Sequence, residues 1–309
     1  MAVYVNTNYS ALQGQRYLSN VNNSLTTTYQ RLSSGLRINS AKDDAAGLQI
    51  ADRLTSQING LNQGNRNASD GIALAQTIES GMDEISGMLQ KVRTLAVQAS
   101  NGTNTTEDRA ALAKEASSLV AEMQRISQQT TYGGKKILAG GGTNTVNKTT
   151  TIYGTAGKGS AGGTMVLQVG SNKGDTITFC VANLTFSVLA KGASKGFLED
   201  KIDKASLGKL VAFSTIDAAQ NLIESMDKLI AKVDGQRAAL GAIQNRLESS
   251  IRNQSNVAAN EADARSRIRD ADFAEESANL SQQSIIQQAA ASMLMQANTR
   301  PQLGLSLLG

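Results

Sequence analysis

The sequence contains no histidine, no tryptophan, one cysteine and one proline among 309 residues. Without histidine there is no imidazole to serve as the base of a Ser-His-Asp or Cys-His arrangement, and none to bind zinc. A single cysteine excludes an internal disulfide and a thiolate metal cluster. These absences remove most common enzyme and metal-site designs. Chemistry based on carboxylates or lysines remains open, but the expectation is a protein that is not an enzyme and has no catalytic residue, metal or cofactor.

Large aromatic side chains are also scarce, at 4% of residues against 40% hydrophobic residues in all. A core built from small aliphatic side chains favours thin helical bundles. The single proline is Pro301. Because proline interrupts helices, its absence from residues 1–300 leaves room for very long ones.

Positive charge is not concentrated in the way that nucleic-acid binding requires. The net charge is +4, and residues 140–213 hold eight lysines against four acids, while the rest of the chain holds twenty-two cations and twenty-two acids. Nucleic-acid sites cluster cations and add stacking aromatics. We therefore expect no nucleic-acid partner.

No membrane or secretory segment is evident. The N-terminus lacks a basic region followed by an apolar one, so it does not resemble a cleavable signal. Residues 277–299 carry no charge, but their many amide and hydroxyl side chains would lack partners in lipid. We expect this stretch to pack against protein and not to enter a membrane.

Helix signals flank a central region of different character. Gly35 is a stop signal, Ser40 and Asp43 have capping-box spacing, and Asn101-Gly102 is typical of a turn. Thr105, followed by Glu107 and Asp108, predicts another helix start. These signals predict helices over 4–33, from Ser40 to near Ser100, and over 106–129.

Mainly apolar residues recur every seven positions on both sides of the central region. One series runs from Leu54 to Ala96, and another runs from Leu222 to Ala264. Such a repeat predicts coiled-coil packing, and a helix of this length needs a partner helix of similar length. The pattern predicts a mainly α fold, a long antiparallel coiled-coil helical rod formed by the N- and C-terminal segments.

The central region changes to β-type patterns. Residues 133–139, 165–170 and 176–181 alternate or are β-branched, and 171–174 has the composition of a hairpin turn. The Gly- and Thr-rich composition of residues 140–163 predicts a loop, and residues 195–210 are predicted to form a short helix. We expect a small β-hairpin-containing central insert.

Three local motifs have an ordinary interpretation beside a functional one. Gly157, Gly159 and Gly162 match a dinucleotide fingerprint, but a strand pattern and not a helix follows, so a loop is favoured. Cys180 shares a strand face with threonines and has no basic neighbour, which favours an incidental thiol over reactivity or pairing between subunits. The charges of residues 265–272 fit a helix junction better than a phosphate site.

The two ends of the chain are amphipathic at helical spacing and almost free of charge. Arg16 is the only charge in residues 1–30. Each end is too poor in apolar area to fold alone, and missing charge lowers the cost of packing identical subunits together. We expect both ends to become ordered by self-assembly, through the apolar residues Leu12, Leu18, Val21, Leu25, Leu32, Ile285, Ile286, Leu294, Met295, Leu303, Leu305, Leu307 and Leu308.

Three strings resemble bacterial flagellin: LSSGLRINSAKDDAAGL at 32–48, QRAALGAIQNRL at 236–247 and SRIRDAD at 266–272. The resemblance covers about 1–139 and 214–309. It implies a secreted, extracellular subunit of the flagellar filament, in a compact form with outer variable domains largely absent. It also implies three parts: a terminal inner-core helical domain (1–40, 270–309), a rod domain with the hairpin (41–139, 165–181, 214–269), and a variable surface-exposed insert (140–164, 182–213).

The resemblance also implies partners. These are further copies of the chain in a helical homopolymer, the flagellar cap and hook-associated proteins, a flagellin-specific secretion chaperone that binds about 273–309, and a host Toll-like receptor. The positions that match the family's receptor site are Gln90, Lys91, Leu95, Gln98 and Glu115. Lys91 stands where recognised flagellins commonly carry arginine, whose planar fork a lysine does not supply.

Two other structural roles and one enzymatic role compete with a filament subunit. A hook–filament junction protein has related termini, and a cytoplasmic coiled-coil scaffold would have similar heptads. A flagellin that carries a metalloprotease insert is excluded because that chemistry needs histidine.

Overall fold

The computed structural model describes residues 7–140, 152–153, 162–186, 188–189, 213 and 215–306, with side chains up to Thr299. It divides into two compact units. Unit 1 comprises residues 1–59 and 257–309, and unit 2 comprises residues 60–256. The helix predicted over 195–210 and most of the loop predicted over 140–163 lie outside the described residues.

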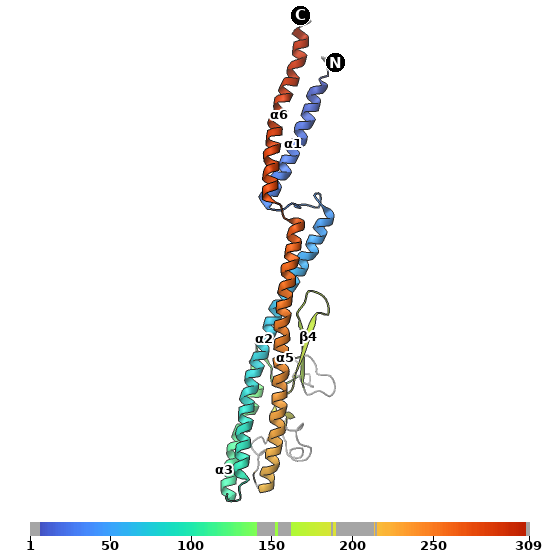
Figure 1. Ribbon diagram of the computed structural model, residues 1–309. Coiled ribbons are helices and arrows are strands. Elements are labelled where there is room, and N and C mark those ends of the chain that lie inside the picture. The colour runs from blue at the N-terminus through green and yellow to red at the C-terminus, as the bar shows by residue number, and fades with distance from the viewer. Residues whose placement is uncertain are drawn as a thin grey trace. The chain divides into compact units, whose positions relative to one another are not determined.

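Unit 1 contains a pair of antiparallel helices from the two ends of the chain, α1 (Tyr9–Ser34) and α6 (Phe273–Ser306), which lie side by side (Figure 1). The side chain of Asn8 accepts a hydrogen bond from Ala11 N (3.1 Å) and caps α1. Gly35 ends α1 with a φ of +70°, a left-handed conformation that glycine adopts without steric cost. The helix end that Gly35 predicts is thus confirmed.

The start of α2 (Ala45–Ala99) differs from the expectation. Ser40 and Asp43 do not begin the helix: the Asp43 carboxylate accepts hydrogen bonds from Asn39 N (3.1 Å) and Ser40 N (2.9 Å), which form a turn before it. These backbone donors hold the pKa of Asp43 below its ordinary value. Asp44 caps α2 instead, because its side chain accepts from Gly47 N (2.9 Å). The two adjacent acids made the choice of capping residue ambiguous in the sequence.

In unit 2, α2 packs antiparallel to α5 (Ile216–Arg269). Two ion pairs mark the direction, because Asp83 lies opposite Arg237 (3.0 Å) and Arg93 lies opposite Asp227. A third helix, α3 (Thr106–Gln129), begins with a capping box of Thr105 and Asp108, and the helix start predicted there is confirmed. The mainly α fold is therefore confirmed, including the pairing of N- and C-terminal segments.

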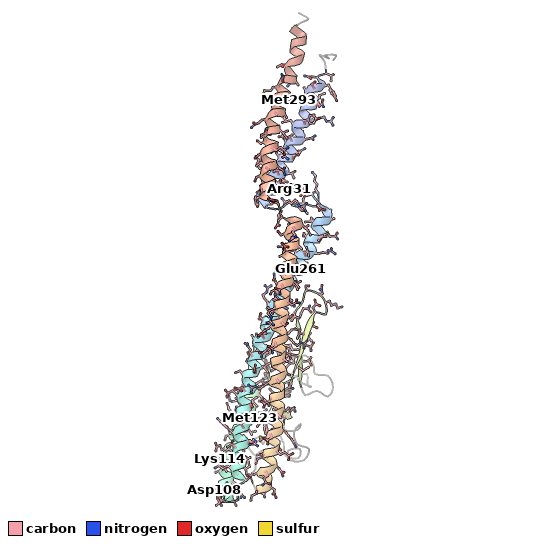
Figure 2. The ribbon with its side chains drawn as sticks, in the orientation of Figure 1. Arg31, Asp108, Lys114, Met123, Glu261 and Met293 are labelled. Atoms are coloured by element: carbon pink, nitrogen blue, oxygen red, sulfur yellow. The ribbon has the colours of Figure 1, made fainter. Side chains whose placement is uncertain are left out.

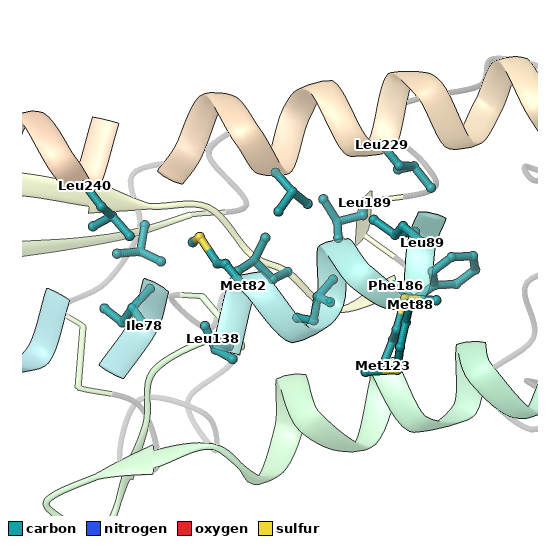
Figure 3. Packing of buried hydrophobic residues seen from close by; sticks show 14 of the residues in the cluster. Ile78, Met82, Met88, Leu89, Met123, Leu138, Phe186, Leu189, Leu229 and Leu240 are labelled. Atoms are coloured by element: carbon teal, nitrogen blue, oxygen red, sulfur yellow. The ribbon is translucent and has the colours of Figure 1, made fainter. Parts of the chain in front are cut away.

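The main hydrophobic core lies in unit 2, between α2, α3, α5 and the central segment (Figure 3). Met82 and Leu89 of the predicted heptad series in α2 are buried, as are Leu229 and Leu240 of α5. Met123 of α3 and Phe186 complete this packing in the close view. Small aliphatic and sulfur-containing side chains thus fill most of the core, as the scarcity of aromatics predicted.

The predicted hairpin is present as antiparallel strands β3 (Gly163–Gln168) and β4 (Thr176–Val181). Cys180 lies on the exposed face, opposite the buried face of Ile177, Phe179 and Val181, as alternation predicted. The hairpin lies against α2, where Asn67 Nδ2 donates a hydrogen bond to Gln168 O (2.9 Å). Gly64 permits this close approach, because a side chain there would collide with the Val169 carbonyl.

The strand expected over 133–139 is not continuous. Two-residue strands β1 (Thr131–Tyr132) and β2 (Lys135–Lys136) pair antiparallel around Gly133 and Gly134. Both glycines have positive φ, at +57° and +78°. They form a turn at the point where the sequence predicted a continuous strand.

Candidate assembly and receptor-binding surfaces

The predicted assembly residues divide between the contact of α1 with α6 and the exposed surface of the pair. Leu25 is buried, whereas Leu18, Val21, Leu32 and Leu294 are half-buried. Leu12, Ile285, Ile286 and Met295 are exposed, with Ile285 at 68% and Met295 at 67%. The side chains of the remaining four, Leu303, Leu305, Leu307 and Leu308, lie outside the described residues. The helix pair therefore uses only part of its apolar surface internally.

Sequence reasoning missed further apolar and aromatic residues on this surface. Tyr9, Tyr17 and Tyr29 of α1 are exposed, as is Met293 of α6 (Figure 2). Tyr17 and Met293 line a hollow of about 590 Å³ beside Gly14, between the two helices. The sequence shows these side chains, but it does not say which residues of an amphipathic helix remain exposed after the two helices pair.

The polar contacts between α1 and α6 are mostly uncharged. Gln287 Nε2 donates to Asn22 Oδ1 (2.8 Å), and Asn8 Nδ2 donates to the carbonyl oxygen of Ala297 (2.8 Å). One ion pair joins the described parts of the two helices, between Arg31 Nη1 and Glu276 Oε1 at 3.0 Å. This pair was also missed, although Arg31 is one of few charges near either end of the chain.

The charge cluster at 265–272 forms a junction with the segment that follows α1. The backbone amides of Arg37 and Ile38 both donate to Arg269 O, at 2.7 and 3.3 Å. Leu36 forms an isolated antiparallel β-bridge with Asp270. Arg267 pairs with Asp263 (3.0 Å), and Asp270 accepts from Ser266 Oγ (2.6 Å). The backbone contacts fit the helix-junction interpretation. The acids 270 and 272, however, bind a hydroxyl and a backbone amide and not the arginines.

Four of the five predicted receptor residues surround one hollow of about 510 Å³ between α2 and α3. Gln90, Lys91 and Leu95 come from α2, and Glu115 comes from α3. All are exposed except Leu95, which is half-buried and packs against the core. Gly87 and Thr94 complete the lining. Gln98 does not line the hollow.

The hollow owes its shape to a missing side chain and its electrostatics to two opposite charges. A Cβ at Gly87 would have no neighbour within 4 Å, so this position leaves open space on the helix. Lys91 and Glu115 place a cation and an anion on its rim, and Leu95 supplies an apolar surface. Such a site suits a protein partner with an apolar side chain flanked by polar groups.

In the described part of the chain, no group of three or more acidic or cysteine side chains is placed to hold a metal ion. Within the same residues, no helix is long and apolar enough to cross a bilayer.

Comparisons with known proteins assign the family. A family model of the bacterial flagellin N-terminal helical region matches residues 5–143, and one of the C-terminal helical region matches residues 223–308. Polar flagellin C of Vibrio parahaemolyticus serotype O3:K6 (strain RIMD 2210633) is 34% identical over 384 aligned residues that cover 100% of both chains. The chain belongs to the bacterial flagellin family.

Flagellin B of Vibrio cholerae serotype O1 (strain ATCC 39541) is similar to this flagellin at 35% identity, again over 100% of both chains. The crystal structure of Bacillus cereus flagellin has 23% identity, covers 61% of this chain and 88% of its own, and has a TM-score of 0.43. Flagellins are structural proteins of the extracellular flagellar filament. The predicted family, structural role and location are thereby confirmed.

Proposed function

We propose that this flagellin transmits torque for swimming through a helical polymer in which the α1–α6 pair forms the subunit contacts. The exposed apolar residues of that pair, above all Ile285 and Met295, support this proposal. A helix pair with so much uncovered apolar surface gains stability by packing against further copies. Heterologous contacts that do not close into a ring then generate a filament.

We also propose that the α1–α6 pair binds partners other than further copies of the chain. The flagellar cap and hook-associated proteins would contact filament ends, and a secretion chaperone would cover 273–309 before export. The rival proposal is a hook–filament junction protein, which would add in few copies. Seeded growth of the purified chain, followed by electron microscopy, separates the two, because only a filament subunit elongates the seed without limit.

The assembly proposal is tested by deleting residues 277–309 and by changing Ile285→Ser. The deletion should abolish filament growth, and the point change should raise the critical concentration for polymerisation. Because Ile285 is 68% exposed, its loss should leave the helicity of the monomer unchanged. Ser281→Ala, on an exposed residue one turn away, is the matched control. Normal filament growth by the deletion variant would refute the assembly role of the C-terminal segment.

We also propose that the α2–α3 hollow is a recognition site for a host Toll-like receptor. The convergence of Gln90, Lys91, Leu95 and Glu115 on one hollow supports it. The more compact ammonium of Lys91 should bind less well than a guanidinium, because it lacks the planar fork of arginine. Gln98 stays part of this proposal as a neighbouring contact outside the hollow.

Leu95→Ala should reduce receptor signalling by about tenfold or more, as expected for an apolar residue at the centre of a protein interface. Motility should change little. Val97→Ala is the control, because Val97 is an apolar residue two positions along α2 that is exposed and does not line the hollow. The measurement is a reporter-cell dose–response curve for each purified variant. Equal curves for Leu95→Ala and the parent would remove this residue from the site.

A further inference from the structure

The ion pair between Arg31 and Glu276 differs from every other polar contact described between α1 and α6. It is charged, and the side chain of Glu276 is only 8% exposed, against 31% for Arg31. The remaining side-chain contacts join amides, hydroxyls and a carbonyl, as in the bond from Thr28 Oγ1 to Gln283 Oε1 (3.5 Å). A buried charge with a single cationic partner thus lies in an interface that is otherwise almost uncharged.

The uncharged contacts discriminate poorly between alternative alignments of the two helices. Amides and hydroxyls recur along both: α1 contains Asn20, Asn22 and Asn23, and α6 contains paired glutamines at 282–283 and 287–288. If α6 slides by seven residues, the same helix faces still meet. Asn22 then lies opposite Leu294 or Leu280, but its bond with Gln287 is exposed, so water can replace the lost partner at little cost.

The charged pair does discriminate. A slide of seven residues in one direction places Gln283 opposite Arg31, and a slide in the other direction places Ser24 opposite Glu276. In either case the carboxylate loses its cation. A buried carboxylate without a cation is strongly unfavourable, because desolvation is no longer offset. A polar or charged group inside a helix interface is well suited to fixing its register for this reason.

We propose that Arg31 and Glu276 form a positioning pair that fixes the register of α1 against α6. The inference rests on the proposed role of this helix pair in filament assembly. Register determines which apolar side chains stand side by side on the exposed surface, so a slipped pair presents Leu12 and Ile285 in the wrong alignment to the next subunit. The pair contributes specificity here more than it contributes affinity.

Gly14 provides a direct probe of register. A Cβ at position 14 would lie 3.8 Å from the Cβ of Leu294, which is the mean Cβ–Cβ distance in disulfides. In a Cys180→Ser background, Gly14→Cys with Leu294→Cys should therefore cross-link under a mild oxidant. Gly14→Cys with Gln287→Cys, one heptad away, reports the slipped register. Non-reducing gels and peptide mass spectrometry measure both yields, in monomers and in filaments.

Three variants are then compared in each cysteine background. Arg31→Glu places two carboxylates together and should lower the 14–294 yield and raise the critical concentration by about tenfold or more. The double swap Arg31→Glu with Glu276→Arg should restore both. Arg16→Glu is the matched control, because Arg16 is exposed on α1 and makes no ion pair in the described residues; it should leave the cross-link in place.

The outcomes separate the two proposals. An unchanged 14–294 yield in Arg31→Glu, or a double swap that restores nothing although the parent cross-links, would overturn the positioning role. A parent chain that forms filaments without the 14–294 cross-link would also overturn it while leaving the assembly proposal intact. If Arg31→Glu lowers the 14–294 yield and the double swap restores it, but the chain without cysteine substitutions does not polymerise, the positioning role is supported and the assembly proposal is refuted.

Discussion

Asp108 shows what a single side chain does at the start of a helix. Its carboxylate accepts hydrogen bonds from Thr105 N (3.0 Å) and Thr105 Oγ1 (2.8 Å), while Thr105 Oγ1 accepts from Asp108 N (3.2 Å). Backbone and hydroxyl donors favour the charged form, so they lower the pKa of Asp108. The reciprocal bonds satisfy two backbone amides that the helix itself leaves free.

The lowered pKa of Asp108 predicts a pH-dependent contribution to stability. A carboxyl whose pKa is lower in the folded state stabilises that state above the unfolded pKa, near 3.8, and the contribution is lost as the pH falls through the folded pKa. Asp108→Asn should therefore lower the melting temperature at neutral pH, and the difference from the parent should shrink in acid. Glu107→Gln, one residue earlier, is the control. A difference that stays constant with pH would contradict the prediction.

At the scale of single residues, the sequence was informative where one candidate stood alone. Thr105 and Asp108 cap α3 at the helix start that they predict, and Gly35 ends α1. The sequence did not identify the capping residue of α2, because Asp43 and Asp44 are adjacent and chemically equal. Only the path of the chain after Gly35 selects Asp44 as the cap. The role of Glu276 was hidden for a related reason, because burial depends on which helix lies opposite.

At the scale of elements, long periodic patterns predicted helices well, and short patterns predicted strands less well. The heptads of α2 and α5 extend over many turns, so polar positions such as Gln236 and Ser250 do not obscure them. The alternation of β3 and β4 covers both strands of one hairpin. By contrast, residues 133–139 combine a β-type composition with Gly133 and Gly134, and the backbone freedom of this pair decides the turn.

The candidate receptor site also depends on relations between elements. Nothing in the spacing of Gln90 and Lys91 indicates that Glu115 lies beside them, because this requires α3 to fold back along α2. The resemblance to flagellin named these residues, and the structure supplies their common hollow. Gly87 escaped notice because its contribution is the absence of a side chain.

At the scale of the whole molecule, buried apolar side chains are distributed unequally. Those of the main core, from Ala68 to Leu247, belong to unit 2. In the described part of unit 1, the buried apolar side chains are Leu25, Ile38, Ala51 and Ile58. Because local stability follows buried apolar contacts, unit 2 should resist opening more than the α1–α6 pair. This inequality suits a subunit whose ends gain stability only in the polymer.

Hydrogen exchange of the monomer should therefore show two levels of protection, with the amides of α1 and α6 exchanging faster than those of unit 2. Met82→Ala should lower the free energy of opening of unit 2 by about 2–5 kcal/mol, because Met82 is fully buried and its loss leaves a cavity. Exchange in α1 and α6 should not change. In filaments, protection of these two helices should rise toward that of unit 2. If Met82→Ala accelerated exchange equally in both units, the chain would open as one cooperative body, and the ends would not depend on the polymer for their stability.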